Sequence, residues 1–538
     1  MDNVYEFYGE VPEPEKGQQV TDEVRRKKPR GRTDFFFFIL NAGFIFVLFI
    51  LFFYCFFNGS IYRKIYGYDE CGNVCGLENS GNEDQSCQNP DKRNSPLLRL
   101  DELECVHQCP SDSVQHGTIC LPAGIYLVNG SAHSYDVRLD VIGISLAVAI
   151  GFAYIILVSL RHFTKFVVWF VVGAFALLML LLLILCLYAG EWLEAIVFIV
   201  IGVILLLLFI RRKDKMEFVI KLFKEAAKSL MDMPMLLFEP LLTVLSLIIA
   251  TFCCVYFMLV IDSAGTFNKA LYQFEQNAVI KFTYWLNIFV YFWFVQFILG
   301  CQHFVAASTV SQWYFTRNKS LVRRPVCNAF SDLIIFHLGT ICLGSLLLTL
   351  IKILRCIMNG IKRSIRQSNN ILAVALVYVY DFLLRLLEDA ISFLTSNAYI
   401  VTAIDGLPFI AAGKRAVHLI FTNFGEKLAA ELVGDIVVWT CKLFIFFTSL
   451  LVSYELLFSG DQQTGDGLFS FCIIIVLAFL VTHVMLGTFE STIDTLFVCY
   501  SIDTEENDGV VRPFFMSESL KNTMFEAKQL GPPMAQQV

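Results

Sequence analysis

Nine segments of this chain are each apolar enough and long enough to cross a lipid bilayer. An α-helix rises about 1.5 Å per residue, so about 20 apolar residues span the roughly 30 Å of hydrocarbon in a membrane. Composition agrees, because 56% of the residues are hydrophobic and the 52 phenylalanines outnumber all 48 aspartates and glutamates. We therefore predict an all-α polytopic membrane protein. The segments are Phe35 to Phe57, Leu139 to Leu160, Phe166 to Ala189, Trp192 to Ile210, Pro234 to Ile261, Phe282 to Val310, Ala329 to Ile351, Leu443 to Phe458 and Leu468 to Gly487.

A run of six basic residues directly precedes the first apolar segment. Loops rich in lysine and arginine stay on the cytoplasmic side and are attracted to anionic lipid, so the N-terminus is predicted inside. The first segment is too long for a cleaved signal sequence and is predicted to remain as a signal anchor. The formal charge of −7 is small for a chain of this length. It argues against a nucleic-acid partner, which would call for a strongly basic surface. The basic residues are Arg25, Arg26, Lys27, Lys28, Arg30 and Arg32.

The longest polar block between apolar segments runs from Asn58 to Arg138 and holds six cysteines. It follows the first span on the outer, oxidising side, and it has too few large apolar groups to build a core unaided. We therefore predict a disulfide-rich extracellular loop, with the pairing left open. Zinc is the alternative, because cysteines separated by three residues occur twice, but no histidine pattern follows them. The cysteines are Cys71, Cys75, Cys87, Cys105, Cys109 and Cys120.

Two glycosylation sequons fall within this polar block, at Asn129 and Asn58. Glycans are attached on the outer side of a membrane, so both sequons support an extracellular location for the block. Asn58 borders the bilayer, which makes Asn129 the stronger candidate.

The segment Tyr66–Gly76 reads Tyr-Gly-Tyr-Asp-Glu-Cys-Gly-Asn-Val-Cys-Gly. Its glycines allow positive φ and its aspartate and asparagine cap turns, which predicts a compact turn held by cysteines. The segment resembles the choline transporter-like family (solute carrier family 44), whose members carry Gly-x-Asp-x-x-Gly-Asn-x-Cys-Gly at this place. Shorter matches to the family occur in the same order along nearly the whole chain, at residues 33–35, 297–302, 313–315, 336–339, 397–400, 505–509 and 515–517.

The charges of the loops predict which side of the membrane each loop occupies. Basic residues place the loops around residues 161–165, 211–215, 317–324 and 414–427 inside, whereas residues 262–281 and 459–467 are predicted outside. Between the inside loops at 317–324 and 414–427 the number of crossings must be even, yet only Ala329 to Ile351 is a clear span. The nine segments therefore give one crossing between these two loops, where an even number is required.

We favour a concealed crossing from about Ile371 to Ala403, which gives about ten transmembrane helices, in agreement with the family. This segment is interrupted by charged residues, and the crossing would place a basic stretch outside, against the charge rule. A re-entrant pair or a helix lying on the inner surface is the alternative. The interrupting residues are Asp381, Arg385, Glu388 and Asp389, and the basic stretch is Lys352, Arg355, Lys362, Arg363 and Arg366.

One segment of the predicted inside loop after the fourth span is amphipathic. The apolar residues between Phe218 and Leu230 fall on one helical face and three lysines on another, which predicts an interfacial helix lying against lipid. The resulting organisation is a cytoplasmic tail (1–34), a first transmembrane helix (35–57), the Cys-rich extracellular loop (58–138), a helical core (139–489) and a second cytoplasmic tail (490–538).

Candidate substrate-binding residues follow from the chemistry of a quaternary ammonium, which aromatic faces hold by cation–π attraction with help from a carboxylate. The sixth apolar segment carries the aromatic candidates, although packing against lipid explains most aromatics in membranes. Glu239 is the carboxylate candidate, because it lies between Pro234 and Pro240, where a broken helix would serve a substrate site; capping of the helix start is the alternative. The other candidates are Trp285, Tyr291, Trp293 and Gln296.

Three histidines near apolar segments, His303, His337 and His483, could carry protons if transport is proton-coupled, as the resemblance implies; hydrogen-bonded core histidines are the alternative. Glu490 and Asp494, one helical turn apart at the end of the last segment, are interpreted as a solvated face.

The sequence carries no zinc-protease, phosphate-loop or nucleophile-elbow motif, so we expect no enzyme, no cofactor and no metal site. The resemblance implies a multi-pass transporter for choline or a related small amine such as ethanolamine, working by alternating access in the lipid bilayer. The plasma membrane is the expected location, with an organellar membrane as the alternative. A channel or a lipid scramblase is the competing class. The oligomeric state is left open.

Overall fold

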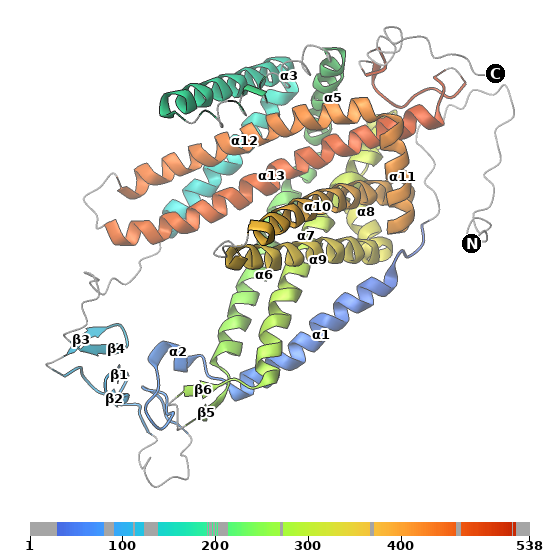
Figure 1. Ribbon diagram of the computed structural model, residues 1–538. Coiled ribbons are helices and arrows are strands. Elements are labelled where there is room, and N and C mark those ends of the chain that lie inside the picture. Colours follow the sequence, from blue (N-terminus) through green and yellow to red (C-terminus); the bar gives the residue numbers. More distant parts are fainter. Residues whose placement is uncertain are drawn as a thin grey trace.

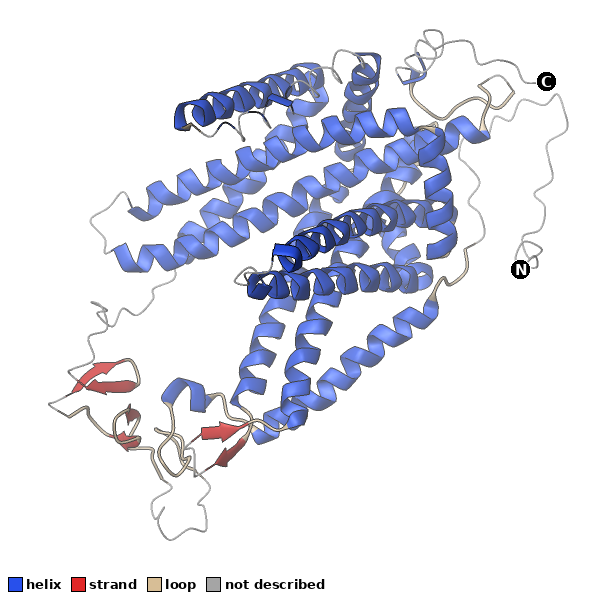
Figure 2. Cartoon of the chain, viewed as in Figure 1, coloured by secondary structure: helices blue, strands red, loops and turns tan. Residues whose placement is uncertain are grey.

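The computed structural model describes residues 30–79, 91–110, 113–122, 138–190, 213–268, 273–365, 371–458, 464–509, 511–518 and 520–522, with a few single residues between 192 and 202. Long helices pack together, and the described strands form two small sheets (Figures 1 and 2). The described helices are α1 (Phe35–Asn58), α2 (Tyr62–Tyr66), α3 (Leu139–Ala189), α5 (Lys213–Asp232), α6 (Met235–Ser263), α7 (Ala278–Tyr314), α8 (Pro325–Asp332), α9 (Leu338–Ile365), α10 (Ile371–Asp405), α11 (Phe409–Thr422), α12 (Phe424–Phe458) and α13 (Thr464–Glu506).

The prediction of an all-α polytopic membrane protein is confirmed. Within the described residues, 7 helices are long and apolar enough to cross a membrane. An eighth is obtained if Leu376–Asp405 and Phe409–Thr422, which meet at a bend of 102°, are counted as one broken span. The predicted total of about ten is not confirmed, since most of the expected span from Trp192 to Ile210 lies outside the described residues.

The second and third apolar segments are joined without a loop. They form the single helix α3, which is broken only at Phe163, where the backbone leaves the helical region (φ −123°, ψ 30°). The basic residues Arg161 and Lys165 therefore lie at a kink and not in the connecting loop that the sequence predicted.

Helices α9 and α10 form an antiparallel hairpin, and α10 occupies the stretch where the concealed crossing was predicted. Lys362 pairs with Asp381 at 2.7 Å and Arg355 pairs with Glu388, so residues later in α9 meet residues earlier in α10. Two of the five cations that argued against this crossing, Arg355 and Lys362, thus pair with carboxylates that interrupted its apolar sequence. Such pairing lowers the cost of placing charges in or near lipid.

The apolar face of α5 is buried in protein, so the prediction that it lies against lipid is wrong. Val219, Leu222 and Phe223 are all completely buried in the main hydrophobic core. Phe223 packs edge-on against Phe489 of α13, at 5.9 Å between ring centres. Helices α3, α12 and α13 supply the apolar surface that lipid was expected to provide.

The Cys-rich block folds into a small disulfide-bonded domain around a four-stranded sheet. The strands β1 (Leu97–Arg99), β2 (Glu104–Val106), β3 (Ser113–His116) and β4 (Ile119–Pro122) are arranged in the order β2-β1-β4-β3, with β1 and β4 parallel. Disulfides join Cys75 to Cys105 and Cys109 to Cys120, and Cys71 is also disulfide-bonded. The predicted disulfide-rich loop is therefore confirmed. Cys87 and Asn129 lie outside the described residues.

The Tyr66–Gly76 segment docks this domain onto the connection between α6 and α7. Asp69 accepts hydrogen bonds from the amides of Cys71 and Asn73, which closes the predicted turn. Gly72 has φ +79°, and a side chain here would come within 2.9 Å of Phe267 in the hairpin of β5 (Thr266–Asn268) and β6 (Gln273–Glu275). The signature segment thus connects the outer domain to two long helices of the core.

Candidate functional site

A central cavity of about 330 Å³ lies among α7, α9, α10 and α13. Its lining is polar for a site between apolar helices, with two histidines, two glutamines, five hydroxyl side chains and one carboxylate. The lining residues are Gln296, Leu299, Gly300, Gln302, His303, Leu348, Ser392, Thr395, Ser396, Tyr399, His483, Val484, Gly487, Glu490 and Ser491.

Two glycines position Tyr399, which is the aromatic residue in this lining. A side chain at Gly300 would come within 2.8 Å of Ile341, and one at Gly344 would fall on the Tyr399 hydroxyl. These glycines therefore let α7 and α9 close on the tyrosine ring. The hydroxyl donates a hydrogen bond of 3.1 Å to the Ile341 carbonyl, which satisfies its polar group within the helix packing.

An acidic vestibule of about 410 Å³ adjoins the central cavity between α10, α12 and α13, and the two share Ser392 and Glu490 as lining residues. The vestibule lies where the candidate span Val433–Phe458 begins. Five carboxylates line it, and Phe393 adds an aromatic ring. The carboxylates are Asp389, Glu431, Asp435, Glu490 and Asp494.

Two lysines of α12 pair with these carboxylates. Lys442 donates to Glu490 at 2.9 Å, and Lys427 donates to Asp494 at 2.7 Å while also lying 3.3 Å from Glu431. Five carboxylates and two ammonium groups leave three formal negative charges around the vestibule. This imbalance makes the vestibule favourable for cations.

The charge network holds Lys427 protonated. Burial by itself would lower the pKa of Lys427, but the neighbouring Asp494 and Glu431 outweigh it and raise the pKa above its ordinary value. Burial also raises the pKa of Glu431, against the opposing effect of Lys427. The lysine is therefore a fixed positive charge near the start of α12.

Two of the three predicted histidines line the central cavity. The ring of His303 is held on both sides, with Nδ1 at 2.8 Å from the Ser491 hydroxyl and Nε2 at 3.2 Å from the Ser396 carbonyl. His483 lines the same cavity and stacks on Phe479. His337 lies elsewhere and contacts the Thr33 hydroxyl at 2.9 Å.

Of the substrate-binding candidates from the sequence, Gln296 lines the central cavity, where its side-chain oxygen accepts from Lys352 at 3.1 Å. Trp293 is fully buried and donates to the Ser345 hydroxyl at 3.1 Å. Trp285 is 68% exposed on the surface of the helix bundle.

The other two candidates form hydrogen bonds with side chains of α6. Tyr291 shares a hydrogen bond of 2.9 Å with Thr251 of α6. Glu239 is buried, and one of its oxygens accepts from Thr243 at 2.8 Å. Neither lines the central cavity or the vestibule.

Sequence reasoning missed the two carboxylates of α13 that line the chambers. Glu490 and Asp494 were interpreted as a solvated face, but both line the vestibule and pair with lysines. Their spacing of four residues was the available signal, because it places both carboxylates on one face of α13. Tyr399 lies within a short family match, and nothing in its sequence neighbourhood indicated a cavity.

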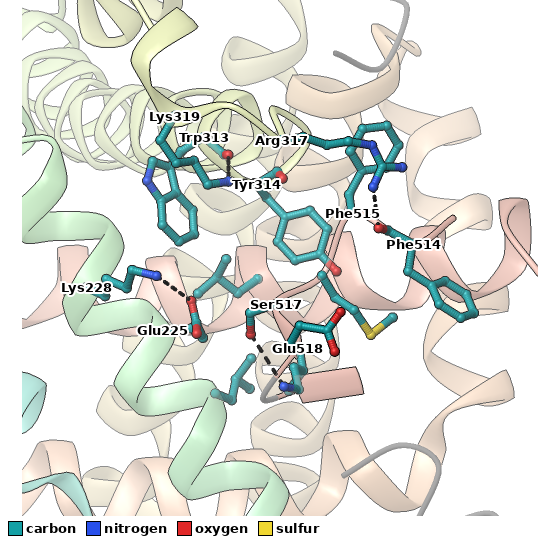
Figure 3. A pocket seen from close by; sticks show the side chains of 14 residues that line it. Glu225, Lys228, Trp313, Tyr314, Arg317, Lys319, Phe514, Phe515, Ser517 and Glu518 are labelled. Atoms are coloured by element: carbon teal, nitrogen blue, oxygen red, sulfur yellow. Dashed lines mark hydrogen bonds and ion pairs between the residues drawn. The ribbon is translucent and has the colours of Figure 1, made fainter. Parts of the chain in front are cut away.

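A third cavity of about 300 Å³ lies between α5, the end of α7, α13 and the C-terminal segment (Figure 3). Arg317 donates to the Phe514 carbonyl at 2.8 Å, and the Lys319 ammonium donates to the Thr316 carbonyl at 2.8 Å. Both cations thus satisfy backbone carbonyls, and acidic residues lie beside them in the lining. This arrangement fixes the C-terminal segment against the core and offers a cation no excess of negative charge.

Comparison with known proteins matches residues 196–505 to a family described as plasma-membrane choline transporter. All residues that line the central cavity and the vestibule fall within this range. Choline transporter-like protein 1 of Xenopus laevis is 30% identical over 335 residues, covering 61% of this chain and 51% of that protein. Choline transporter-like protein 3 of Bos taurus is 28% identical over 345 residues, covering 62% and 52%. The chain spans about half the length of these two relatives.

Proposed function

We propose that this chain, which belongs to the plasma-membrane choline transporter family, carries choline across the plasma membrane through the central cavity. The observation that carries the proposal is the connection between the two chambers at Glu490. This carboxylate lines both the polar central cavity and the acidic vestibule, so a cation drawn in by the vestibule meets the cavity at a negative charge.

The chemistry of choline fits this arrangement. Its trimethylammonium group has no N–H to donate, so it is held by negative charge and by aromatic faces. Glu490 supplies the charge, while Tyr399 and Phe393 supply rings in the cavity and the vestibule. Lys427 already places its ammonium 5.8 Å from the Phe393 ring centre, which supports the use of that ring by a cation. The choline hydroxyl finds partners among the amide and hydroxyl groups of the cavity.

Ethanolamine is proposed as a second, weaker substrate. Its ammonium group carries N–H donors and needs acceptors. The Val484 carbonyl and the Thr488 hydroxyl already accept from the Gln302 amide, and the Ser396 carbonyl from His303, so they supply acceptors only in part. Proton exchange is proposed to involve His303 and His483, since both line the chamber that the substrate would occupy.

Of the candidate substrate-binding residues from the sequence, Gln296 is proposed to contact the substrate. Trp293 and Tyr291 are proposed to support the cavity through α7, and Glu239 through α6. Trp285 is proposed to face lipid, because so exposed an aromatic side chain on a spanning helix matches an interfacial position.

The test is uptake of labelled choline into cells that express this chain, compared with untransfected cells. We expect saturable uptake that unlabelled choline inhibits strongly and ethanolamine weakly, with a rate that changes when the pH gradient across the membrane is varied. Trans-stimulation, in which choline inside the cell accelerates exchange, distinguishes alternating access from a channel. Uptake no greater than in untransfected cells, with the protein shown at the surface, would refute the proposal.

The matched variants are Glu490→Gln and Asp262→Asn. Glu490→Gln removes the shared carboxylate and should reduce choline uptake at low concentration at least about tenfold, because the cavity loses its negative charge and with it the attraction for the cation. Asp262 pairs with Lys64 in a half-exposed ion pair outside both chambers, so Asp262→Asn should leave uptake unchanged.

A further inference from the structure

We infer that Lys442 is a tethered cation that occupies the carboxylate of Glu490 when the cavity is empty, and that a substrate cation binds by displacing it. The inference rests on the proposed function and deepens it, because it names the competitor that tunes affinity at the same site. It assigns Lys442, which lines neither chamber, a positioning role through Glu490.

The two side chains of this ion pair differ in their exposure. The Lys442 ammonium lies 2.9 Å from Glu490, and Lys442 is only 6% exposed. The Glu490 side chain is 40% exposed and lines both chambers. The Lys442 ammonium therefore contacts the carboxylate from the packed interface between α12 and α13. The exposed part of the carboxylate faces the space that a substrate would enter.

The neighbouring pair differs in a way that indicates exchange at Glu490. Lys427 lies within ion-pair distance of two carboxylates, Asp494 and Glu431, and near two aromatic rings. Among the described residues, Lys442 lies within ion-pair distance of Glu490 alone, and its one aromatic neighbour is the Trp439 ring at 5.4 Å. Lys427 is thus held by several partners, whereas Lys442 depends on one carboxylate that is open to a rival cation.

The exchange balances charge at each stage. Lys442 is buried, and a buried ammonium without a carboxylate is costly, so its pairing with Glu490 keeps the empty site neutral. When a substrate ammonium takes its place, the lysine needs another acceptor. Asp435 lies seven residues earlier on α12, two helical turns away on the same face, and it lines the vestibule. The site then accepts one monovalent organic cation at a time, since a single charge is exchanged for a single charge.

The experiment measures binding separately from transport. The purified full-length chain in detergent is titrated with tetramethylammonium, and binding is read from the rise in Tm. We expect Lys442→Met to lower the apparent Kd about tenfold or more, because the competitor is gone, while Glu490→Gln raises it by a similar factor. Lys442→Arg keeps the charge and should stay within about twofold of the wild type.

Lys362→Met is the control for loss of an inter-helix lysine. Lys362 pairs with Asp381 on the α9–α10 hairpin, away from both chambers, so its replacement should change Tm but not the tetramethylammonium Kd. If Lys442→Met does not fold, Lys442→Met combined with Glu490→Gln removes both charges. The double variant should bind as weakly as Glu490→Gln alone.

The outcomes separate this inference from the proposed function. An unchanged or raised Kd in folded Lys442→Met, tighter binding by the double variant than by Glu490→Gln, or no tetramethylammonium binding by any variant would each overturn the inference. Choline uptake by the wild type would still stand in those cases. Absence of choline uptake, combined with the expected Kd series, would instead refute choline as the substrate and leave the displaced lysine supported.

Discussion

The carboxylate of Asp34, at the start of α1, accepts a hydrogen bond of 2.8 Å from the backbone amide of Phe409, at the start of α11. The same carboxylate accepts from the Thr340 hydroxyl at 2.7 Å, and the adjacent Thr33 amide donates to the Phe336 carbonyl at 2.9 Å. The residues before the first helix thus cap α11 and bind the start of α9. One short polar segment joins three helices that are far apart in the sequence.

Replacement of Asp34 by alanine should destabilise the protein. The change leaves the Phe409 amide without its acceptor and leaves the Thr340 hydroxyl with only the Thr33 hydroxyl, at a cost of about 1–3 kcal/mol. A lower Tm in detergent would show this, with Asp34→Asn, which keeps one oxygen, giving a smaller decrease. Asp262→Ala, which removes a half-exposed ion pair, should leave Tm nearly unchanged. Equal Tm values for Asp34→Ala and wild type would contradict the capping role.

Gly344→Ala should impair choline uptake by displacing Tyr399. The added methyl would fall on the tyrosine hydroxyl, so the ring must move within the central cavity. Gly360 lies in the same helix with nothing within 4 Å of an added methyl, which makes Gly360→Ala a matched control. We expect an increased KM and a lower Tm for Gly344→Ala alone. Identical uptake by the two variants would show that the position of Tyr399 does not matter for the substrate.

Asp389→Asn tests the attraction of cations by the vestibule. Asp389 is an exposed lining residue, so the loss of its charge should slow the arrival of choline without changing the later steps. The expected result is a KM raised by a few fold with an unchanged kcat, and a difference from wild type that shrinks as ionic strength increases. A difference that is independent of salt would argue against a long-range electrostatic effect.

Asp503→Ala should release the C-terminal segment from the core. The buried carboxylate accepts from the Tyr314 hydroxyl at 3.1 Å and from the amides of Phe515 and Met516 at 2.9 Å each. Limited proteolysis should cleave residues 511–518 at least about tenfold faster in Asp503→Ala, since several hydrogen bonds are lost together. Tyr314→Phe removes one of them and should have a smaller effect. Unchanged cleavage would mean that other contacts hold the segment.

Removal of the Cys75–Cys105 disulfide should unfold the outer domain more readily. The bond closes a stretch with a sequence separation of 30, and the chain-entropy argument predicts a loss of about 2–4 kcal/mol. Replacement of both cysteines by serine should reduce the amount of protein at the cell surface, measured by surface labelling. The double replacement of Cys109 and Cys120, with a separation of 11, should have the smaller effect.

Much of the fold was predictable because the apolar pattern of a membrane helix is long and strong. The first span was predicted as Phe35 to Phe57, and α1 covers Phe35–Asn58. Parity also predicted a crossing hidden by charges, and the helix α10 occupies that stretch of the sequence. The prediction of a loop around Arg161 was wrong, because a basic residue near a helix kink and a basic residue in a short loop give the same sequence pattern.

The candidate site was less predictable, because a cavity depends on which helix faces meet. Gln296 was singled out and lines the central cavity, but Glu490 acquires its place only through the approach of α12 and α13. Trp293 was a candidate because of the aromatic content of its segment. Its contact with Phe44 and its hydrogen bond to Ser345 depend on how the helices pack, and the sequence does not reveal them. Periodicity gives the face of a helix and not the identity of its neighbour.

The sequence by itself determined that this chain is helical, crosses a membrane several times and carries a disulfide-bonded outer loop, because hydrophobic length and cysteine spacing are local properties. Only the tertiary structure decided that the charges of α10 pair with those of α9, that the apolar face of α5 is buried in protein, and that Glu490 faces two chambers with Lys442 behind it. These relationships join residues from different helices, and their energies depend on distance and burial, which appear only when the helices are packed.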